Sequence, residues 1–149
     1  MSGQSVTVRR VLQASCEEVF DAWLDAEGMT EWMRPGPAMT CDVELEPRTG
    51  GRFRIVMKAP GAEFINTGEF LVLDRPVRLQ FTWVSSRWEN QETLVTVELR
   101  RVGVECELVL THERFPLESS AVQLVHGWNQ ILEELARVFD LDRPGSGSA

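Results

Sequence analysis

The sequence predicts an α+β fold in which a curved, seven-stranded antiparallel sheet wraps around one long C-terminal helix. The segment Ser120–Phe139 carries apolar side chains at three- and four-residue steps, which is the period of an amphipathic helix. Before it, residues 39–112 alternate apolar and polar side chains between short turns, as hairpin-linked strands do. An open sheet of this size twists strongly and can curl around a single helix.

The chain begins with a strand and a short helix. Val6–Leu12 is rich in β-branched residues and predicts the first strand. Ser15 and Glu18 then form a capping-box pattern, which starts a helix that we expect to end at Gly28.

A second short helix is expected before the next strand. Thr30 is its predicted N-cap, and Trp32 and Met33 give it an apolar side. Pro35-Gly36-Pro37 ends it, since proline cannot continue a helix and disfavours helical geometry in the residue before it.

The period changes to two at Met39, where the run of strands begins. Alternation places one set of side chains inward on the first two of these strands: Met39, Cys41, Val43, Leu45, Phe53, Ile55 and Met57. The register of the next strand stays open, because two alternating sets compete for the inner face: Phe64, Phe70 and Val72, or Ile65, Leu71 and Leu73.

Three further strands complete the predicted sheet. They span Val77–Val84, Thr93–Leu99 and the segment from Val104 to His112, with Gly103 in the last hairpin turn. Their inward residues are Leu79, Phe81, Trp83, Val95, Val97, Leu99, Val104, Cys106, Leu108, Leu110 and His112. Ser120 and Gln123 form a second capping-box pattern at the start of the long helix, and Pro144 lies beyond its end.

Length and charge restrict the function. We expect 149 residues to form a single domain over residues 1–141, followed by a disordered Gly-Ser tail over residues 142–149. A net charge of −8 without a basic cluster excludes nucleic acids and anionic membrane surfaces as partners. No segment is long and apolar enough to span a bilayer.

The cysteines and histidines predict no reactive centre. Cys16, Cys41 and Cys106 are an odd number in a chain whose N-terminus has no signal-peptide pattern, so we expect a reduced, cytoplasmic protein. His112 and His126 lie on different elements without paired cysteines, and we therefore expect neither a metal ion nor a cofactor.

Several short motifs together resemble one known family. The sequence is similar to the activator of heat-shock-protein ATPase homologues, which belong to the START and birch-pollen-allergen (SRPBCC) superfamily. The resemblance runs from about Val6 to Phe139 and rests on these residues: Phe20-Asp21-Ala22-Trp23, Thr30-Glu31-Trp32-Met33-Arg34-Pro35, Arg48-Thr49-Gly50-Gly51-Arg52-Phe53, Leu79-Gln80-Phe81-Thr82-Trp83, Thr111-His112-Glu113-Arg114-Phe115 and Gly127-Trp128. The sequence departs from the family pattern at Glu46 and Met33, where the family commonly has aspartate and tryptophan. The resemblance implies a helix-grip fold with a cavity between the sheet and the long helix.

We expect the inward side chains around this cavity to form a ligand site. They are Phe53, Ile55, Met57, Leu79, Phe81 and Trp83 on the sheet, opposed by Leu124, Trp128 and Leu132 on the helix. Gly127, inside the helix, suggests that another group approaches the backbone closely there.

Two ionisable residues are candidates for the same cavity. His112 follows Leu110 on the inner face and is either an acid–base or ligand-binding group or a hydrogen-bonded core residue. Glu69 faces the cavity in one register of its strand and solvent in the other.

Three classes of function remain open from the sequence. The first is a binder or carrier of a small apolar or aromatic molecule. The second is an enzyme of the cyclase or hydrolase type that uses His112 or Glu69 in the cavity. The third is an interaction protein whose outer surface contacts a chaperone or another partner. Trp88, in a polar loop, is a lid residue or a homodimer contact. Converging ionisable groups in the cavity would favour the enzyme, and an apolar wall the carrier.

Overall fold

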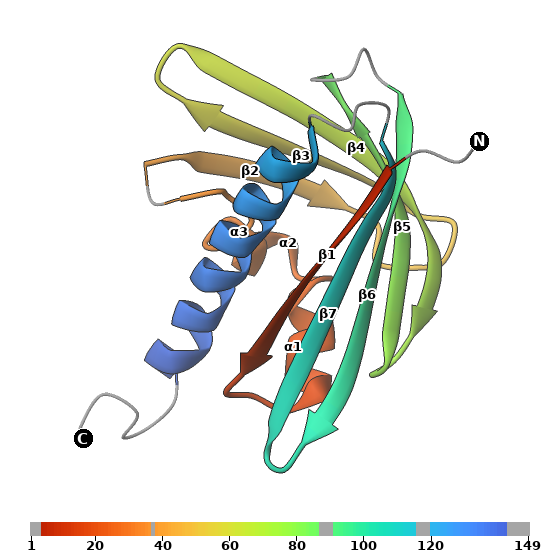
Figure 1. Ribbon diagram of the computed structural model, residues 1–149, viewed down its shortest axis with the longest axis vertical. Coiled ribbons are helices and arrows are strands. Elements are labelled where there is room, and N and C mark those ends of the chain that lie inside the picture. The colour runs from red at the N-terminus through yellow and green to blue at the C-terminus, as the bar shows by residue number, and fades with distance from the viewer. Residues whose placement is uncertain (1–3, 37, 87–90, 116–119, 143–149) are drawn as a thin grey trace.

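The computed structural model of the protein describes residues 4–36, 38–86, 91–115 and 120–142 (Figure 1). Its elements in chain order are β1 (Gln4–Leu12), α1 (Cys16–Ala22), α2 (Ala26–Met29), β2 (Thr40–Leu45), β3 (Arg52–Ala59), β4 (Ala62–Asp74), β5 (Arg78–Ser85), β6 (Glu92–Val102), β7 (Glu105–Phe115) and α3 (Ser120–Asp142). The strands form one antiparallel sheet in the order β1-β7-β6-β5-β4-β3-β2. The predicted α+β class and the seven-stranded curved sheet are confirmed.

The long helix α3 lies across the concave side of the sheet, with β1 beside it and the short helices α1 and α2 near the sheet's inner side (Figure 1). Its apolar stripe is buried, as its period predicted: Leu124, Trp128, Ile131, Leu132 and Leu135. The inward residues of β3, β5, β6 and β7 face this stripe and form a single hydrophobic core with it. The core therefore lies between α3 and the inner face of the sheet, and buried residues of α1, α2 and the turn after α2 complete it.

The short helices differ partly from the prediction. The capping box at α1 is present, because the Ser15 hydroxyl accepts from the Glu18 amide and the Glu18 carboxylate accepts from the Ser15 amide. The second helix starts earlier than expected, since the Asp25 side chain caps it by accepting from the Gly28 amide. The expectations that Gly28 ends the first helix and that Thr30 caps the second are therefore wrong.

A bulge explains why the register of β4 was ambiguous. The pairing of β4 with β5 shifts between Phe70 and Val72, so different alternating sets face inward before and after this point. Before the bulge, Asn66 and Phe70 are buried on the inner face; after it, Leu73 packs against the core. Gly68 lies between them, where a Cβ would collide with the Thr82 carbonyl oxygen and the Phe53 ring.

The ends of α3 also differ slightly from the prediction. Ser120 is the first helical residue rather than the N-cap, and the residue before it lies outside the described residues. The helix includes Asp142, one residue into the predicted tail. The rest of that tail, residues 143–149, and the loop residue Trp88 lie outside the described residues.

Replacement of Trp128 tests whether α3 is held by its central side chain. The side chain is 3% exposed, so Trp128→Ala should lower the free energy of unfolding by about 3 to 5 kcal/mol. Urea unfolding followed by circular dichroism measures this, with Val122→Ala on the exposed face of α3 as the control. An unfolding midpoint equal to that of the wild type would show that Trp128 does not hold the helix.

Candidate functional site

A pocket of about 90 Å³ lies between α3 and the sheet near the N-terminal half of the helix. Its lining comes from the segment after α2, from strands β3, β4 and β5, and from α3: Pro35, Met39, Met57, Phe64, Asn66, Trp83, Ser85, Gln123, Leu124, Gly127, Trp128 and Ile131. Gln123 is exposed, so the pocket reaches the surface. None of these lining residues is ionisable.

The helix wall of the pocket contains a glycine that protein packing does not require. A Cβ built at Gly127 would meet no atom of another part of the described chain within 4 Å. The close approach expected at this position is therefore not made by a described protein group. Because Gly127 lines the pocket between Leu124 and Trp128, the missing side chain leaves room inside the pocket itself.

The sheet wall of the pocket contains two polar side chains within an otherwise apolar surface. Asn66 on β4 and Ser85 on β5 are cross-strand partners and are 3% and 1% exposed. Around them lie Met57, Phe64 and Trp83, and the Trp83 ring packs against Trp128 at a centroid distance of 5.3 Å. The pocket is therefore apolar with one uncharged polar spot.

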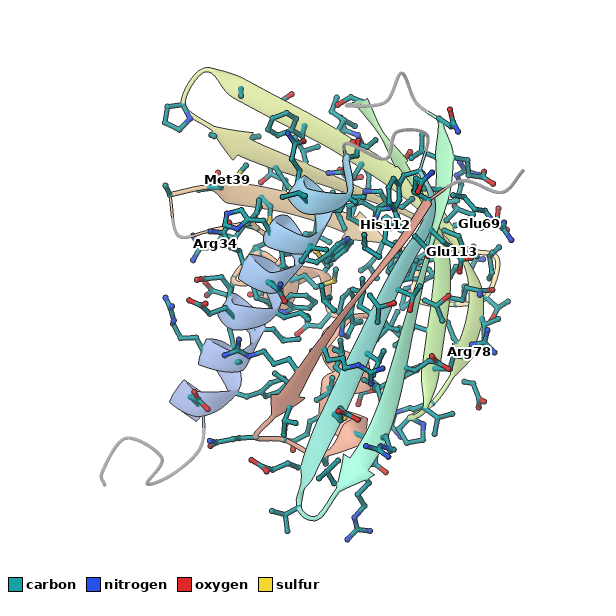
Figure 2. All side chains as sticks on the ribbon, viewed as in Figure 1. Arg34, Met39, Glu69, Arg78, His112 and Glu113 are labelled. Carbon is teal, nitrogen blue, oxygen red and sulfur yellow. The ribbon has the colours of Figure 1, made fainter. Side chains whose placement is uncertain are left out.

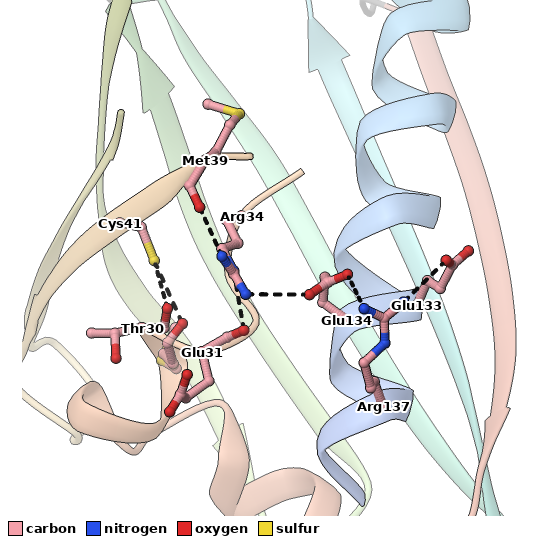
Figure 3. Close-up of polar contacts among 9 residues, drawn as sticks. Thr30, Glu31, Arg34, Met39, Cys41, Glu133, Glu134 and Arg137 are labelled. Atoms are coloured by element: carbon pink, nitrogen blue, oxygen red, sulfur yellow. Dashed lines mark hydrogen bonds and ion pairs between the residues drawn. The ribbon is translucent and has the colours of Figure 1, made fainter. Parts of the chain in front are cut away.

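Arg34 holds one side of the pocket against α3 (Figure 3). Its guanidinium donates to the carbonyl oxygens of Glu31 at 3.2 Å and Met39 at 2.9 Å, and pairs with the Glu134 carboxylate at 3.5 Å. Arg137 pairs with the same carboxylate at 3.4 Å. These contacts fix the segment that carries Pro35 and Met39 onto the helix.

The predicted ligand residues divide into three groups. Met57, Trp83, Leu124 and Trp128 line the pocket. Phe53, Ile55 and Phe81 line a second space of only about 10 Å³, because aromatic rings pack there at centroid distances of 5.4 to 6.3 Å. Leu79 and Leu132 are fully buried in the core and line neither space. The open space is thus narrower than predicted and lies nearer the start of α3.

Glu69 does not face the pocket. Its neighbours Gly68 and Phe70 are the buried residues, so its side chain lies on the opposite face of β4. Figure 2 shows Glu69 on the outer side of the sheet, away from Arg34 and Met39 beside α3. The inclusion of Glu69 among the cavity residues is therefore wrong, and the bulge is the reason.

His112 is a buried, hydrogen-bonded core residue. The Trp128 indole N–H donates to His112 Nδ1 at 3.0 Å, which leaves the proton on Nε2 to be donated to the Thr93 hydroxyl at 2.8 Å. Thr93 donates in turn to the Trp83 carbonyl oxygen at 2.6 Å. Burial lowers the pKa of His112 to about 3, so the ring is neutral at pH 7. Because His112 does not line the pocket, it has no access to a substrate there.

The buried cysteines Cys41 and Cys106 are not activated as nucleophiles. All three cysteines are free thiols, and burial raises the pKa of Cys41 to about 11 and that of Cys106 to about 12. Within the described part of the chain, no group of three or more His, Cys, Asp or Glu side chains is arranged to hold a metal ion. None of the described helices combines the length and apolarity needed to cross a membrane.

Comparisons with known proteins identify relatives of this fold. The family model described as Activator of Hsp90 ATPase homolog 1-like protein matches residues 13–140. A crystal structure from Chromobacterium violaceum is 25% identical with a TM-score of 0.84, over 91% of this chain and 96% of that chain. A Rhodobacter sphaeroides structure is 21% identical with a TM-score of 0.82, and the match covers 97% of this chain and 99% of that chain. CalU16 from Micromonospora echinospora is 23% identical with a TM-score of 0.71, over 92% and 76%. No curated protein matches. The fold is the expected helix-grip fold.

Acid should destabilise the protein through His112. The unfolded chain protonates this ring near its ordinary pKa of 6.5, whereas the folded protein does so only near 3. Between these values the unfolded state binds more protons, so stability is complete above pH 6.5 and falls as the pH is lowered toward 3. Between pH 7 and pH 5 the free energy of unfolding of the wild type should fall by about 1 to 2 kcal/mol more than that of His112→Gln.

Urea unfolding at both pH values measures this difference, with His126→Gln on the exposed face of α3 as the control. The free energy of unfolding of this control should fall by as much as that of the wild type. An equal pH dependence in wild type and His112→Gln would contradict the low pKa of His112.

The two adjacent glutamates of α3 should differ in their contribution to stability. Glu134 has a side chain 6% exposed between Arg34 and Arg137, whereas Glu133 pairs with Arg137 and is 59% exposed. Glu134→Gln should therefore lower the free energy of unfolding by about 1 to 2 kcal/mol, and Glu133→Gln by less than about 0.5 kcal/mol. Equal unfolding midpoints for the two variants would show that Glu134 does not hold the Arg34 segment.

Proposed function

The chain belongs to the family of Activator of Hsp90 ATPase homolog 1-like proteins, and we propose that it binds a small apolar or aromatic molecule in the pocket between α3 and the sheet. The observation that carries this proposal is Gly127. Glycine in a helix interior is about 1 kcal/mol less favourable than alanine. Nothing in the described protein occupies the position of its side chain, so packing does not explain it. A ligand that occupies this space explains the glycine.

The lining of the pocket favours binding over catalysis. General acid–base or nucleophilic chemistry needs an ionisable or nucleophilic group within reach of the substrate. No lining residue is ionisable, His112 is held behind Trp83 and Trp128, and Glu69 lies on the outer face. Among the described residues, the cyclase or hydrolase alternative therefore finds no acid or base in the pocket wall.

The outer surface gives less support to a chaperone-binding function. The exposed large apolar side chains of the described residues are aliphatic and lie on β1, β4, the β4–β5 turn, the β6–β7 hairpin and α3: Val11, Leu71, Val77, Val102, Val104 and Val122. Single exposed side chains of this kind are normal on a protein surface.

We further propose a reducing, cytoplasmic location, which the three free thiols support.

The size of the pocket limits the ligand. An apolar cavity of about 150 Å³ is known to hold benzene, and this pocket is smaller at about 90 Å³. The pocket must therefore widen to take one small ring. Met39 and Met57 line it, and their unbranched side chains adapt readily. Larger ligands would extend through the mouth beside Gln123. Each 100 Å² of apolar ligand surface buried contributes roughly 2.5 kcal/mol before association costs.

Native mass spectrometry of protein purified without denaturation tests the proposal directly, because a retained ligand adds its mass. Titration with neutral one- and two-ring aromatic compounds, followed by calorimetry and tryptophan emission, tests it for an empty protein. Trp83 and Trp128 both line the pocket and should report binding. If neither a retained mass nor saturable binding is found, the proposal is wrong.

Substitutions at Gly127 should separate folding from binding. Gly127→Ala should raise the free energy of unfolding by up to about 1 kcal/mol, because the added methyl group meets no protein atom. Gly127→Leu should keep the fold and abolish binding, because its side chain fills the pocket. Asn129→Leu, on the exposed face of the same helix, is the matched control and should bind as the wild type does. Unchanged affinity in Gly127→Leu would show that binding occurs elsewhere.

A further inference from the structure

We propose that the pocket selects neutral ligands that carry a hydrogen-bond donor on an aromatic ring, as phenols do, through the side-chain oxygen of Asn66. This inference rests on the proposed function of the pocket and specifies its ligand class. It follows from Asn66, a polar side chain in the pocket wall whose side-chain oxygen has no hydrogen-bond partner among the described residues.

The hydrogen bond of Asn66 determines which of its side-chain atoms is left for a ligand. Its amide nitrogen donates to the Ile55 carbonyl oxygen at 3.3 Å. A carbonyl oxygen only accepts hydrogen bonds, so the nitrogen must lie on that side and Oδ1 on the other. The residue is 3% exposed and lines the pocket, and Oδ1 has no hydrogen-bond partner among the described residues.

An acceptor in this position discriminates between ligands. In the empty pocket, water that enters from the mouth satisfies Oδ1. A ligand that displaces this water must donate a hydrogen bond itself or leave the oxygen buried without one, which is unfavourable. Sites built around a hydrogen bond reject analogues that lack the matching group more strongly than apolar pockets reject a change in size.

The rest of the lining requires the ligand to be uncharged and favours a ring. No lining residue carries a charge that would compensate a buried ionic ligand. Arg34, a cation beside the pocket, already contacts Glu31, Met39 and Glu134. The Trp83 and Trp128 rings meet at an interplanar angle of 61° and offer both a face and an edge to an aromatic ligand. Asn66 and Trp83 line the same pocket, so one ligand can contact both.

Three probes of similar size test the inference on the full-length protein: para-ethylphenol, para-ethylanisole and para-ethylbenzoate. The first is neutral and donates, the second is neutral and cannot donate, and the third is an anion at pH 7. Calorimetry and saturation-transfer NMR give the affinities. Anisole derivatives are more hydrophobic than phenols, so burial of apolar surface alone would favour para-ethylanisole.

We expect para-ethylphenol to bind about tenfold more tightly than para-ethylanisole, and para-ethylbenzoate not to bind. In Asn66→Leu the affinity for para-ethylphenol should fall to that for para-ethylanisole, whereas the affinity for para-ethylanisole should not fall. Thr67→Val, one residue along β4 on the opposite face, is the matched control and should keep the wild-type preference. Should Asn66→Leu fail to fold, the wild-type ratio of the neutral probes decides the question.

The failure of this inference differs from the failure of the proposed function. Equal or tighter binding of para-ethylanisole by the wild type would overturn the role of Asn66 and leave the pocket as an unselective apolar site. Preferred binding of para-ethylbenzoate would overturn the requirement for a neutral ligand. If no probe binds and no molecule is retained on purification, both proposals are wrong.

Discussion

The position of the long helix depends on a chain of buried hydrogen bonds that crosses three neighbouring strands. It runs from the Trp128 indole on α3 to His112 on β7, Thr93 on β6 and the Trp83 carbonyl oxygen on β5. Each donor in this chain has an acceptor. Sliding or rotating the helix by one residue would leave these groups buried and unpaired, at about 1 to 3 kcal/mol for each. Apolar packing brings α3 to the sheet, and this chain restricts it to one position.

The pocket is a consequence of that restriction. On one side of this row of hydrogen bonds the space under the helix is filled by large rings, among them Trp23, Phe53 and Phe81. On the other side the helix presents Gly127, and the opposing strands present Asn66 and Ser85, which are smaller. The helix cannot move closer to close this space without breaking its hydrogen bonds, and Arg34 holds the neighbouring segment in place. A gap therefore persists where the side chains are small.

Periodicity was sufficient to predict the fold but not the composition of the site. The stripe of α3 and the alternation of β3 and β5 identified the core, because burial on one face determines both patterns. The face of Glu69 and Asn66 could not be predicted, since a bulge changes the register within β4 and two apolar sets compete there. Asp25, three residues before Gly28, is an N-cap residue type and marks the true start of α2, which the helical spacing of the apolar residues up to Gly28 does not reveal. The packing of Phe53, Phe81 and Trp83 against each other depends on ring orientations that a strand pattern does not contain.

The strongest argument for a ligand is that two residues of one pocket have features that the surrounding protein does not use. Gly127 loses helix stability relative to alanine, and the side-chain oxygen of Asn66 has no hydrogen-bond partner among the described residues. Neither feature is explained by the packing around it, and a methyl group at Gly127 would fit without movement of its neighbours. Local conflicts of this kind are expected at functional sites, where a bound molecule compensates them. A ring with a donor, placed beside Gly127 and Asn66, compensates both at once.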